Sequence, residues 1–543
     1  MRMKQMARRG VYSFVGFLIL TYLVILRVYS IASGPQLAET AQQQSTYRLE
    51  LAQTRGTFYD CAMRPLTGEE QSVVAAVAPV TEAAAALAEI LPSGGMAEVY
   101  PMLTKGVPFS LSLPELCASS PGIDVFQIDK RYQDQQTAAC VLGYLNGDGT
   151  GAAGLERAFN EYLTEDAGEI AVSYKVDATG RILSGEGRRI DDTYYKKQRG
   201  VVLTIDKQIQ QKAEELAGKY LKKGAVVVLE VPSGAIRAMV SVPTFSPNDV
   251  AASLTSEDSP MMNRALSAYN VGSVFKLVSA AAALENGHSP DEVYECNGGI
   301  PVTGSLFRCF NGIAHGEVDM KEAIAQSCNA YFIHLMQSVP ASEFLDMAEK
   351  LGFGRSAVLA PDYASAPGTL PDSEELQNAR ALANFSFGQG SLTATPLQIA
   401  GLINAVASGG RYSEPYLVEA LVDSSGNLTY QRESQEGTQA FSDETARLLQ
   451  EFMEASVDHG TGEKGEPRIG GAGAKTGTAQ TGVFRDGEEI EQSWYAGFYP
   501  YGDPKYVIVV FGEDGEGGGS TCAPVFRELA DWMAEQTIRA MDG

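Results

Sequence analysis

The stretch AVVVLEVPSGAIRAMVS, residues 225–241, carries the pattern that decides the fold. Apolar runs rich in valine lie on either side of the turn residues 232–234 (PSG), and this arrangement predicts two paired strands. Just before them, 201–206 (VVLTID) predicts a strand and 207–222 predicts an amphipathic helix. A sheet that begins in this way, with helices around it, indicates an α+β domain.

Helical patterns fill the middle of the chain, and strand patterns return near its end. Strands are expected in YAGFYPYG (495–502) and KYVIVVFG (505–512). Helices are expected at 273–286, 318–338, 395–407 and 523–541.

The part of the chain before this domain has a different composition. Residues 33–57, rich in glutamine, alanine and threonine, are expected to form a stalk. An alanine-rich helix interrupted at Pro79 is expected over 72–91, and short strands are expected over 169–199. We therefore place a domain boundary near residue 200.

The N-terminus combines charge and hydrophobicity in the manner of a membrane anchor. Four basic residues precede the uncharged run 10–26 (GVYSFVGFLILTYLVIL), and the first acidic residue is Glu39. The run predicts a transmembrane helix over 11–32, and the basic residues before it place the N-terminus in the cytoplasm. A signal peptide cleaved after 30–32 (SIA) is the alternative, although the length of the run favours a retained anchor. Either way, the body of the chain is expected outside the membrane.

Composition limits the classes of partner and cofactor. The length of 543 residues predicts two or more domains, and the net charge of −25 argues against a nucleic-acid partner. Seven cysteines are too few and too scattered for a disulfide scaffold, although Cys296 and Cys309 are close enough in sequence to pair in an oxidising compartment. C-x-x-C and H-E-x-x-H spacings are both lacking in the sequence, which gives a zinc site little support.

A serine and a lysine stand one helical turn apart in VGSVFKLVSA (271–280). Ser273 is expected in the first turn of a helix, with Lys276 on the same face. The apolar neighbours of Lys276 predict a buried amine, whose pKa desolvation would lower. A neutral amine beside a hydroxyl can accept the proton of an attacking serine. The alternative is a lysine whose tip reaches water from a half-buried helix.

Two more short motifs follow. In 327–329 (SCN), a hydroxyl and an amide could relay a proton and hold a peptide carbonyl, and the alternative is a helix cap. In 475–480 (KTGTAQ), an exposed strand is expected to present a cation, a hydroxyl and a glycine, and the alternative is a glycine-rich turn. A phosphate-binding loop is disfavoured there, because Ala474 replaces the glycine required before the lysine.

The order S-x-x-K, S-x-N, K-T-G is the signature of active-site serine penicillin-recognising enzymes. On these motifs the chain resembles the class B penicillin-binding proteins, which are peptidoglycan D,D-transpeptidases. Val271 departs from the proline usual before G-S in that family, and Cys328 occupies a variable position. Further segments similar to the family's motifs are 55–60 (RGTFYD), 154–156 (GLE), 203–206 (LTID), 388–390 (GQG), 395–398 (TPLQ) and 460–462 (GTG).

The resemblance implies a fold and a division into domains. The implied fold class is α+β: a serine penicillin-recognising transpeptidase domain, in which helices cover an antiparallel sheet. An elongated non-catalytic pedestal or dimerisation module and one N-terminal transmembrane helix would precede it. The expected parts are a cytoplasmic segment (1–10), a membrane anchor (11–32), a stalk and pedestal module (33–200) and the transpeptidase domain (201–543).

The resemblance also implies catalytic roles. Ser273 would attack the penultimate carbonyl of a stem peptide ending in D-Ala-D-Ala, with Lys276 as base. Ser327 would pass the proton to the departing D-Ala. Lys475 and Thr476 would bind the terminal carboxylate.

Three further residues receive roles in the same way. Asn329 would hold the donor's backbone amide, and Gly477 would leave room for the donor strand. The backbone N–H groups of Ser273 and Thr478 would form the oxyanion hole.

The implied partners are the D-Ala-D-Ala donor, an amine acceptor, β-lactams as covalent inhibitors, the cell membrane and, by analogy, a membrane glycosyltransferase. The resemblance requires no metal or organic cofactor. Two rival functions stay open. One is a hydrolase of the D,D-carboxypeptidase or β-lactamase type. The other is a non-catalytic scaffold or penicillin sensor.

Overall fold

The structure is a computed structural model that describes residues 2–33, 45–183, 187–194, 198–485, 487–515 and 517–542. The chain divides into two compact units. The first consists of residues 1–55, 70–130 and 167–196, and the second of 56–69, 131–166 and 197–543. Both units are therefore discontinuous in sequence.

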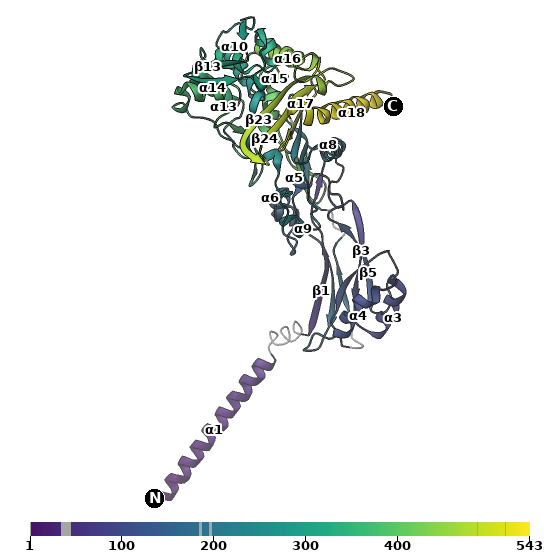
Figure 1. The fold of residues 1–543 in the computed structure, drawn as a ribbon. Helices are drawn as coiled ribbons and strands as arrows, with labels where there is room; N and C mark the ends of the chain where they lie inside the picture. The colour runs from purple at the N-terminus through teal and green to yellow at the C-terminus, as the bar shows by residue number, and fades with distance from the viewer. Residues whose placement is uncertain are drawn as a thin grey trace. The chain divides into compact units, whose positions relative to one another are not determined.

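The N-terminal helix α1, Arg2–Ala32, is coloured purple in Figure 1. Among the described residues it is the one helix that is long and apolar enough to cross a membrane, with a mean hydropathy of 2.1 over its most apolar stretch. Its side chains are exposed in the structure, as expected for a helix whose partner is lipid. The expected membrane-spanning segment is thus present. Its orientation across the membrane is proposed below.

The described residues of the first unit contain two three-stranded antiparallel sheets and two helices beyond α1. Strand β1 begins within the expected stalk, so that the second half of the stalk is a paired strand; residues 34–44 lie outside the described residues. The elements are β1 (Thr46–Gln53), β6 (Glu169–Lys175) and β7 (Arg189–Asp192) in one sheet, β4 (Phe109–Leu113), β3 (Glu70–Val77) and β5 (Ile123–Lys130) in the other, and helices α3 (Thr81–Ile90) and α4 (Gly95–Lys105).

The alanine-rich run before Pro79 is a strand, so the helix expected over 72–91 was wrong in its first half. Strand β3 is the central strand of its sheet and pairs with β4 and β5. Its residues Ala75, Ala76 and Val77 are fully buried. Alanine has the highest helix propensity, but this preference is worth less than about 1 kcal/mol per residue, and pairing with strands on both sides overrides it. The helix begins at Thr81, after the proline.

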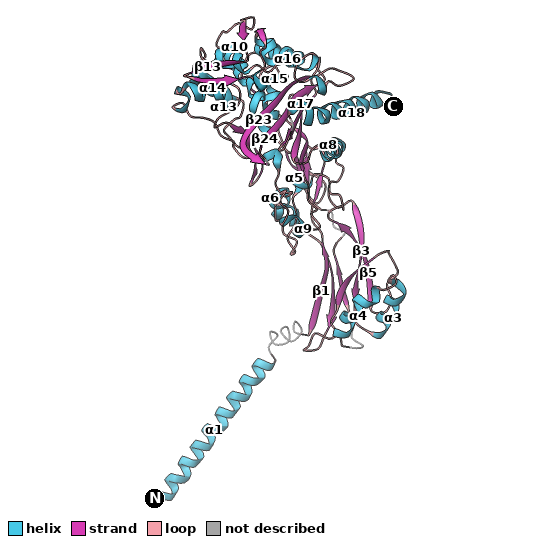
Figure 2. Cartoon of the chain, in the orientation of Figure 1, coloured by secondary structure: helices cyan, strands magenta, loops and turns pink. Residues whose placement is uncertain are grey.

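The second unit is built on a five-stranded sheet, seen in magenta in Figure 2. All neighbouring strands are antiparallel. The sheet brings together segments that lie far apart in the sequence, because the predicted hairpin β9–β10 pairs with the predicted C-terminal strands. In spatial order the strands are β10 (Ile236–Val242), β9 (Gly224–Glu230), β25 (Tyr506–Gly512), β24 (Glu488–Tyr499) and β23 (Gly473–Arg485).

Helices cover both faces of this sheet, and alternating side chains explain why. In β9, Val226 and Val228 pack with helices α8 (Lys207–Tyr220) and α18 (Ala523–Asp542). Its alternate residues Ala225 and Val227 join the larger core on the opposite face, where α15 (Pro396–Ala407) lies. Successive strand residues point to opposite faces, so a continuous apolar run such as AVVVL is buried on both. The predicted α+β architecture is confirmed.

A smaller mixed sheet and five pairs of short strands make up the remaining described strands of the second unit. The sheet contains β2 (Thr57–Tyr59), β8 (Gly200–Leu203), β20 (Val418–Val422) and β21 (Leu428–Gln431). The paired short strands are β11 (Tyr269–Asn270) with β18 (Thr393–Ala394), β12 (Tyr294–Cys296) with β15 (Gly316–Val318), β13 (Gly299–Val302) with β14 (Ser305–Arg308), β16 (Val358–Ala360) with β17 (Tyr363–Ala364), and β19 (Arg411–Tyr412) with β22 (Thr438–Gln439).

The remaining helices of this unit include those that carry the candidate site. The helix expected over 318–338 is two helices, α11 and α12, separated at the S-x-N motif. The α-helices are α5 (Ala139–Leu142), α6 (Gly154–Ala158), α7 (Asn160–Thr164), α9 (Val250–Leu254), α10 (Lys276–Glu285), α11 (Met320–Ala325), α12 (Asn329–Met336), α13 (Ala341–Lys350), α14 (Ala379–Ser386), α16 (Asp443–Asp458) and α17 (Gly518–Thr521), and the 3-10 helices are η1 (Arg264–Leu266), η2 (Gly272–Phe275), η3 (Phe310–Gly312), η4 (Glu375–Gln377) and η5 (Glu463–Gly465).

Candidate active site

Ser273 lies in a 3-10 turn, η2, which leads directly into α10. The turn begins at Gly272, whose φ of +63° suits glycine. A Cβ at this position would lie 2.6 Å from the carbonyl oxygen of Thr478, and the Gly272 N–H donates to the carbonyl of Gly388 at 2.8 Å. The glycine thus lets the turn that carries Ser273 pass close to the K-T-G strand.

Aromatic packing fixes the other side of this turn. The ring of Phe275 lies 4.9, 5.4 and 5.8 Å from those of Phe385, Phe353 and Phe344, centroid to centroid. All four rings are buried, and such pairs add about 0.5–1.5 kcal/mol each beyond the burial of their area. The position of Ser273, two residues earlier, is therefore set by a packed core.

Lys276 is fully buried, and its amine is surrounded by oxygen atoms. Nζ lies 3.0 Å from Ser273 Oγ, 3.1 Å from Ser327 Oγ, 2.7 Å from the Ser327 carbonyl oxygen and 2.6 Å from Asn329 Oδ1. The carbonyl and amide oxygens can only accept, so they take the two hydrogens of a neutral amine. The amine's lone pair is then left to accept a hydroxyl proton.

The protonation state of Lys276 favours this arrangement. Burial lowers the pKa of Lys276 to about 8, although charge on the nearby Cys328 and Cys309 would oppose the shift. A substantial fraction of the amine is therefore neutral near pH 8. The structure thus shows the expected contact between a hydroxyl and an amine whose pKa is lowered, and the neutral state of the amine stays a prediction.

Ser327 occupies the left-handed position that ends α11. Its φ is +58°, and the N–H groups of Ser327 and Cys328 donate to the carbonyls of Ile324 and Ala323 at 3.2 and 2.9 Å. These bonds form a Schellman motif, in which glycine usually takes the left-handed position. A non-glycine residue costs about 1–2 kcal/mol there. The cost is consistent with a need for the serine hydroxyl.

Lys475 reaches the same hydroxyl from a separate element. It lies in β23, the edge strand of the five-stranded sheet, and is fully buried. Its Nζ donates to Ser327 Oγ at 3.0 Å and to the Thr476 carbonyl at 3.0 Å. The three motifs, far apart in sequence, therefore form one hydrogen-bonded constellation.

Two buried amines this close influence one another. The pKa of Lys475 lies well below its usual value, first because of burial and then because of the charge of Lys276. Both lysines cannot readily be charged at once. A bound anion next to Lys475 would favour its charged form and leave Lys276 neutral.

The other predicted site residues lie around this constellation. Asn329 donates from Nδ2 to the Arg308 carbonyl at 3.0 Å, so its amide is held on both sides. Thr478 is partly exposed on β23, next to the nucleophile turn. A Cβ at Gly477 would lie 3.0 Å from the Val274 side chain, so the missing side chain allows strand and turn to approach. That Gly477 also leaves room for a donor strand stays a prediction.

Sequence reasoning did not assign a role to Thr461, which lies in the GTG segment. Its Oγ1 lies 2.6 Å from Oγ1 of Thr476. This hydrogen bond orients one of the predicted substrate-binding hydroxyls. The resemblance of residues 460–462 to a family motif had singled out this segment. It did not predict the contact between Thr461 and Thr476.

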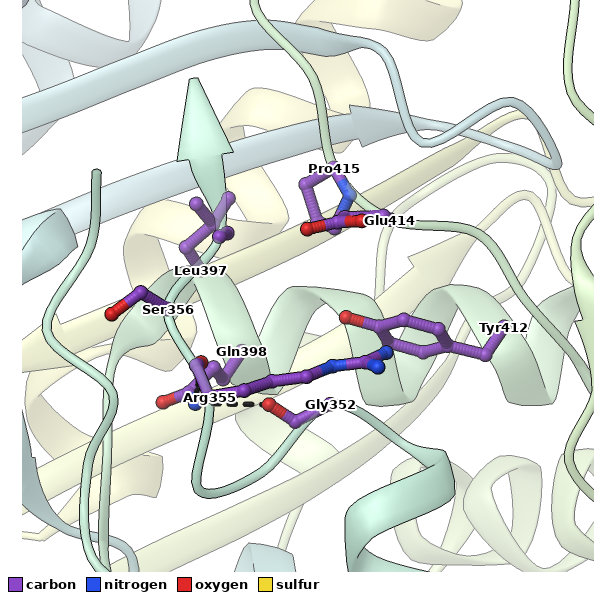
Figure 3. A pocket seen from close by; sticks show the side chains of 9 residues that line it. Gly352, Arg355, Ser356, Leu397, Gln398, Tyr412, Glu414 and Pro415 are labelled. Atoms are coloured by element: carbon purple, nitrogen blue, oxygen red, sulfur yellow. Dashed lines mark hydrogen bonds between the residues drawn. The ribbon is translucent and has the colours of Figure 1, made fainter. Parts of the chain in front are cut away.

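Leu397 and Gln398 of the TPLQ segment line a pocket whose lining includes none of these site residues (Figure 3). Gln398 Nε2 donates to the carbonyls of Gly352, Arg355 and Pro367 at 2.9–3.1 Å, and the Thr395–Gln398 capping box starts α15. This motif is therefore structural. The pocket is lined by Gly352, Arg355, Ser356, Ala357, Leu397, Gln398, Tyr412, Glu414 and Pro415.

Comparison with known proteins agrees with this geometry. The family model "Penicillin binding protein transpeptidase domain" matches residues 224–531. The chain belongs to this family, and the resemblance seen in the sequence is confirmed.

Relatives and solved structures extend the likeness beyond the matched domain. The chain is 31% identical over 438 residues to penicillin-binding protein PbpB of Mycolicibacterium smegmatis, covering 75% of this chain and 65% of that protein. It is 31% identical over 436 residues to the peptidoglycan D,D-transpeptidase PbpA of the same organism, covering 74% and 83%. The chain thus spans less than two thirds of the first relative.

The solved structures show the fold. A ceftriaxone acyl-enzyme complex of penicillin-binding protein A from M. tuberculosis matches with a TM-score of 0.64 and 24% identity, over 88% of this chain and 98% of that one. The match covers most of both chains, so the fold class, including the N-terminal module, is confirmed.

Proposed function

We propose that the chain is a peptidoglycan D,D-transpeptidase that works through an acyl-enzyme on Ser273. The observation that carries the proposal is the 3.0 Å contact between Lys276 Nζ and Ser273 Oγ, with a second lysine on the same relay hydroxyl. The relative PbpA, a peptidoglycan D,D-transpeptidase by name and 31% identical to this chain, supports the same reaction class.

In the acylation step, Ser273 Oγ attacks the carbonyl carbon of the penultimate D-Ala. The neutral amine of Lys276 takes the hydroxyl proton as the C–O bond forms. The N–H groups of Ser273 and Thr478 stabilise the oxyanion, an effect of about 3 kcal/mol for one donor in comparable sites. The proton then passes through the Ser327 hydroxyl to the nitrogen of the departing D-Ala as the C–N bond breaks.

The donor is held by its backbone and its carboxylate. Asn329 binds a donor amide, and Lys475 with Thr476 binds the terminal carboxylate. That carboxylate raises the pKa of Lys475 again and keeps its positive charge. Because Lys276 then faces a charged neighbour, its neutral form is favoured at the moment of attack.

Deacylation returns the enzyme to its starting state. An amine of a second stem peptide attacks the ester carbonyl, loses a proton to the Lys276 and Ser327 pair, and releases Ser273. A β-lactam mimics the donor and forms an ester that this amine does not resolve.

The proposal extends to location and organisation. Helix α1 anchors the chain with its N-terminus in the cytoplasm and the catalytic residues outside, as the basic residues before it favour. Residues 201–543 form the transpeptidase domain, and the non-catalytic module lies within residues 33–200. Of those residues, 56–69 and 131–166 belong to the same compact unit as the transpeptidase domain. A membrane glycosyltransferase that supplies nascent strands is the partner proposed by analogy with the family.

Labelling with a fluorescent penicillin tests the proposal. Wild type is expected to form a stable covalent adduct, and Ser273→Ala is expected to form none. Ser338→Ala, which changes an exposed serine near the end of α12, is the matched control. Labelling of Ser273→Ala would remove the assignment. Rapid loss of label from wild type would favour a hydrolase, and absence of any labelling would favour a scaffold.

A further inference from the structure

Three cysteines and a histidine meet beside the S-x-N motif, although they are spread over 33 positions of sequence, 296–328. They come from the end of β12, the start of η3, the loop before β15 and the start of α12. We call this group the CCHC cluster, and its members are Cys296, Cys309, His315 and Cys328.

The distances within the cluster have the size set by a tetrahedral metal ion. Cys309 Sγ lies 3.6 Å from Cys296 Sγ and 3.9 Å from Cys328 Sγ. With Zn–S bonds of about 2.3 Å, two sulfur ligands of a tetrahedral zinc lie about 3.8 Å apart. All four candidate ligand atoms lie within 4.8 Å of one another.

The histidine completes the same geometry. His315 Nδ1 lies 3.4 Å from Cys296 Sγ. Zn–N and Zn–S bonds at the tetrahedral angle place nitrogen and sulfur about 3.6 Å apart. The imidazole nitrogen thus occupies the fourth ligand position of the tetrahedron and faces the sulfurs.

The surroundings suit an ion with soft ligands. The three thiols are 0–2% exposed, whereas His315 is partly exposed. Thiol–thiol contacts are weak hydrogen bonds and give little reason to gather three sulfurs with an imidazole. A Cys3His set is one of the usual structural zinc sites.

We propose that the CCHC cluster binds one zinc ion in tetrahedral geometry. This goes beyond the transpeptidase function and departs from the expectation of no metal. The protein's ligands fill all four positions, so the ion is structural and takes no part in the chemistry.

The ion would fix the loop that carries two catalytic residues. Cys328 stands between Ser327 and Asn329, and the Tyr331 N–H donates to its Sγ at 3.4 Å. Arg308 precedes Cys309, and its backbone carbonyl accepts a hydrogen bond from Asn329 Nδ2. One ion would therefore hold both the strained left-handed Ser327 and the amide of Asn329 against the β13–β14 hairpin.

Metal analysis of the purified full chain in detergent tests the proposal. Inductively coupled plasma mass spectrometry is expected to give about one zinc per chain for wild type. Cys309→Ser and His315→Gln are expected to lose most of it. Cys522→Ser is the matched control, because this buried cysteine donates to the Ser493 carbonyl far from the cluster in sequence, and it should keep the ion. Wild type without zinc, even after incubation with zinc, would overturn the proposal.

Two further measurements keep the test independent of variants that fail to fold. Cobalt added to metal-stripped wild type should give the thiolate charge-transfer and d–d bands of a tetrahedral site, and octahedral spectra would contradict the proposal. Mass analysis after alkylation without reductant should show all three cluster thiols reduced. A Cys296–Cys309 disulfide in the protein as purified would overturn it.

The consequence for the active site can be measured separately. Removal of zinc by a chelator is expected to slow labelling by fluorescent penicillin about tenfold or more, with recovery on adding zinc alone. Labelling that is unaffected by zinc removal would contradict the positioning role. If zinc is bound but Ser273→Ala still labels, the transpeptidase proposal fails and the metal site stands.

Discussion

The Lys475 Nζ lies 3.0 Å from the Ser327 hydroxyl oxygen, so the edge strand of the sheet and the break between α11 and α12 share one hydrogen bond. Lys276 approaches the same oxygen at 3.1 Å from a third element. The Ser327 hydroxyl thus contacts both amines: that of Lys276, beside the proposed nucleophile, and that of Lys475, proposed to bind the carboxylate. The predictions below follow from this position.

Ser327→Ala should slow acylation by fluorescent penicillin about 10²- to 10⁴-fold, the range for loss of a general acid–base group. In the proposed mechanism the hydroxyl relays the proton, and the methyl group of alanine leaves both amines without a shared acceptor. Stopped-flow labelling measures the rate. A change of less than about threefold, with Ser338→Ala as reference, would show that the proton takes another route.

Arginine substitutions distinguish the roles of the two lysines. Lys276→Arg should reduce the acylation rate at least about a hundredfold, because a guanidinium stays protonated and cannot act as a base. Lys475→Arg keeps a cation for the carboxylate and should lose only about tenfold. The rates are compared by the same labelling assay, with thermal unfolding as a check on folding. Equal losses in the two variants would contradict the assignment of roles.

The acylation rate should depend on pH through Lys276. Burial lowers the pKa of this lysine to about 8, and the neutral amine is the active form. The second-order acylation constant should rise about tenfold per pH unit below pH 8 and level off above it. Protons bind the unfolded state more readily between the two pKa values, so this lysine contributes more stability as pH rises from about 8 to about 10.5. A rate that is flat or falls as the pH rises from about 6 to about 8 would contradict the mechanism.

Much of the catalytic domain could be predicted from local sequence. The hairpin 225–241 and the strand 505–512 have apolar runs whose alternation buries them on both faces of the sheet. Ser273 and Lys276 are three residues apart, so helical geometry alone brings them together. These parts of the fold and of the site depend on patterns and spacings that are short in sequence.

The rest depends on tertiary packing that no local pattern records. Strand β3 contains residues that favour helix, and only its two neighbouring strands make it extended. The bond between Ser327 and Lys475 joins residues 148 positions apart, so only the family signature pointed to it. The CCHC cluster has none of the short ligand spacings by which zinc sites are found in sequence.

Glycine 388 offers a final test of how the nucleophile turn is held. Its φ is +82°, and a Cβ there would collide with the carbonyl oxygen of Gly272, one residue before the nucleophile. Gly390 has a similar φ of +86°, yet its Cβ would meet only the Asn384 side chain, at 3.3 Å. The two positions therefore share backbone strain and differ in the collision.

Gly388→Ala should lower the free energy of unfolding by about 3 kcal/mol or more, because the turn and the GQG loop must move apart. Gly390→Ala should cost only about 1–2 kcal/mol, the strain of a left-handed alanine. Acylation should fall in Gly388→Ala and stay near wild type in Gly390→Ala, since only the first change displaces Ser273. Thermal unfolding and stopped-flow labelling measure both effects. Equal behaviour of the two variants would mean that close backbone approach at Gly272 does not position the nucleophile.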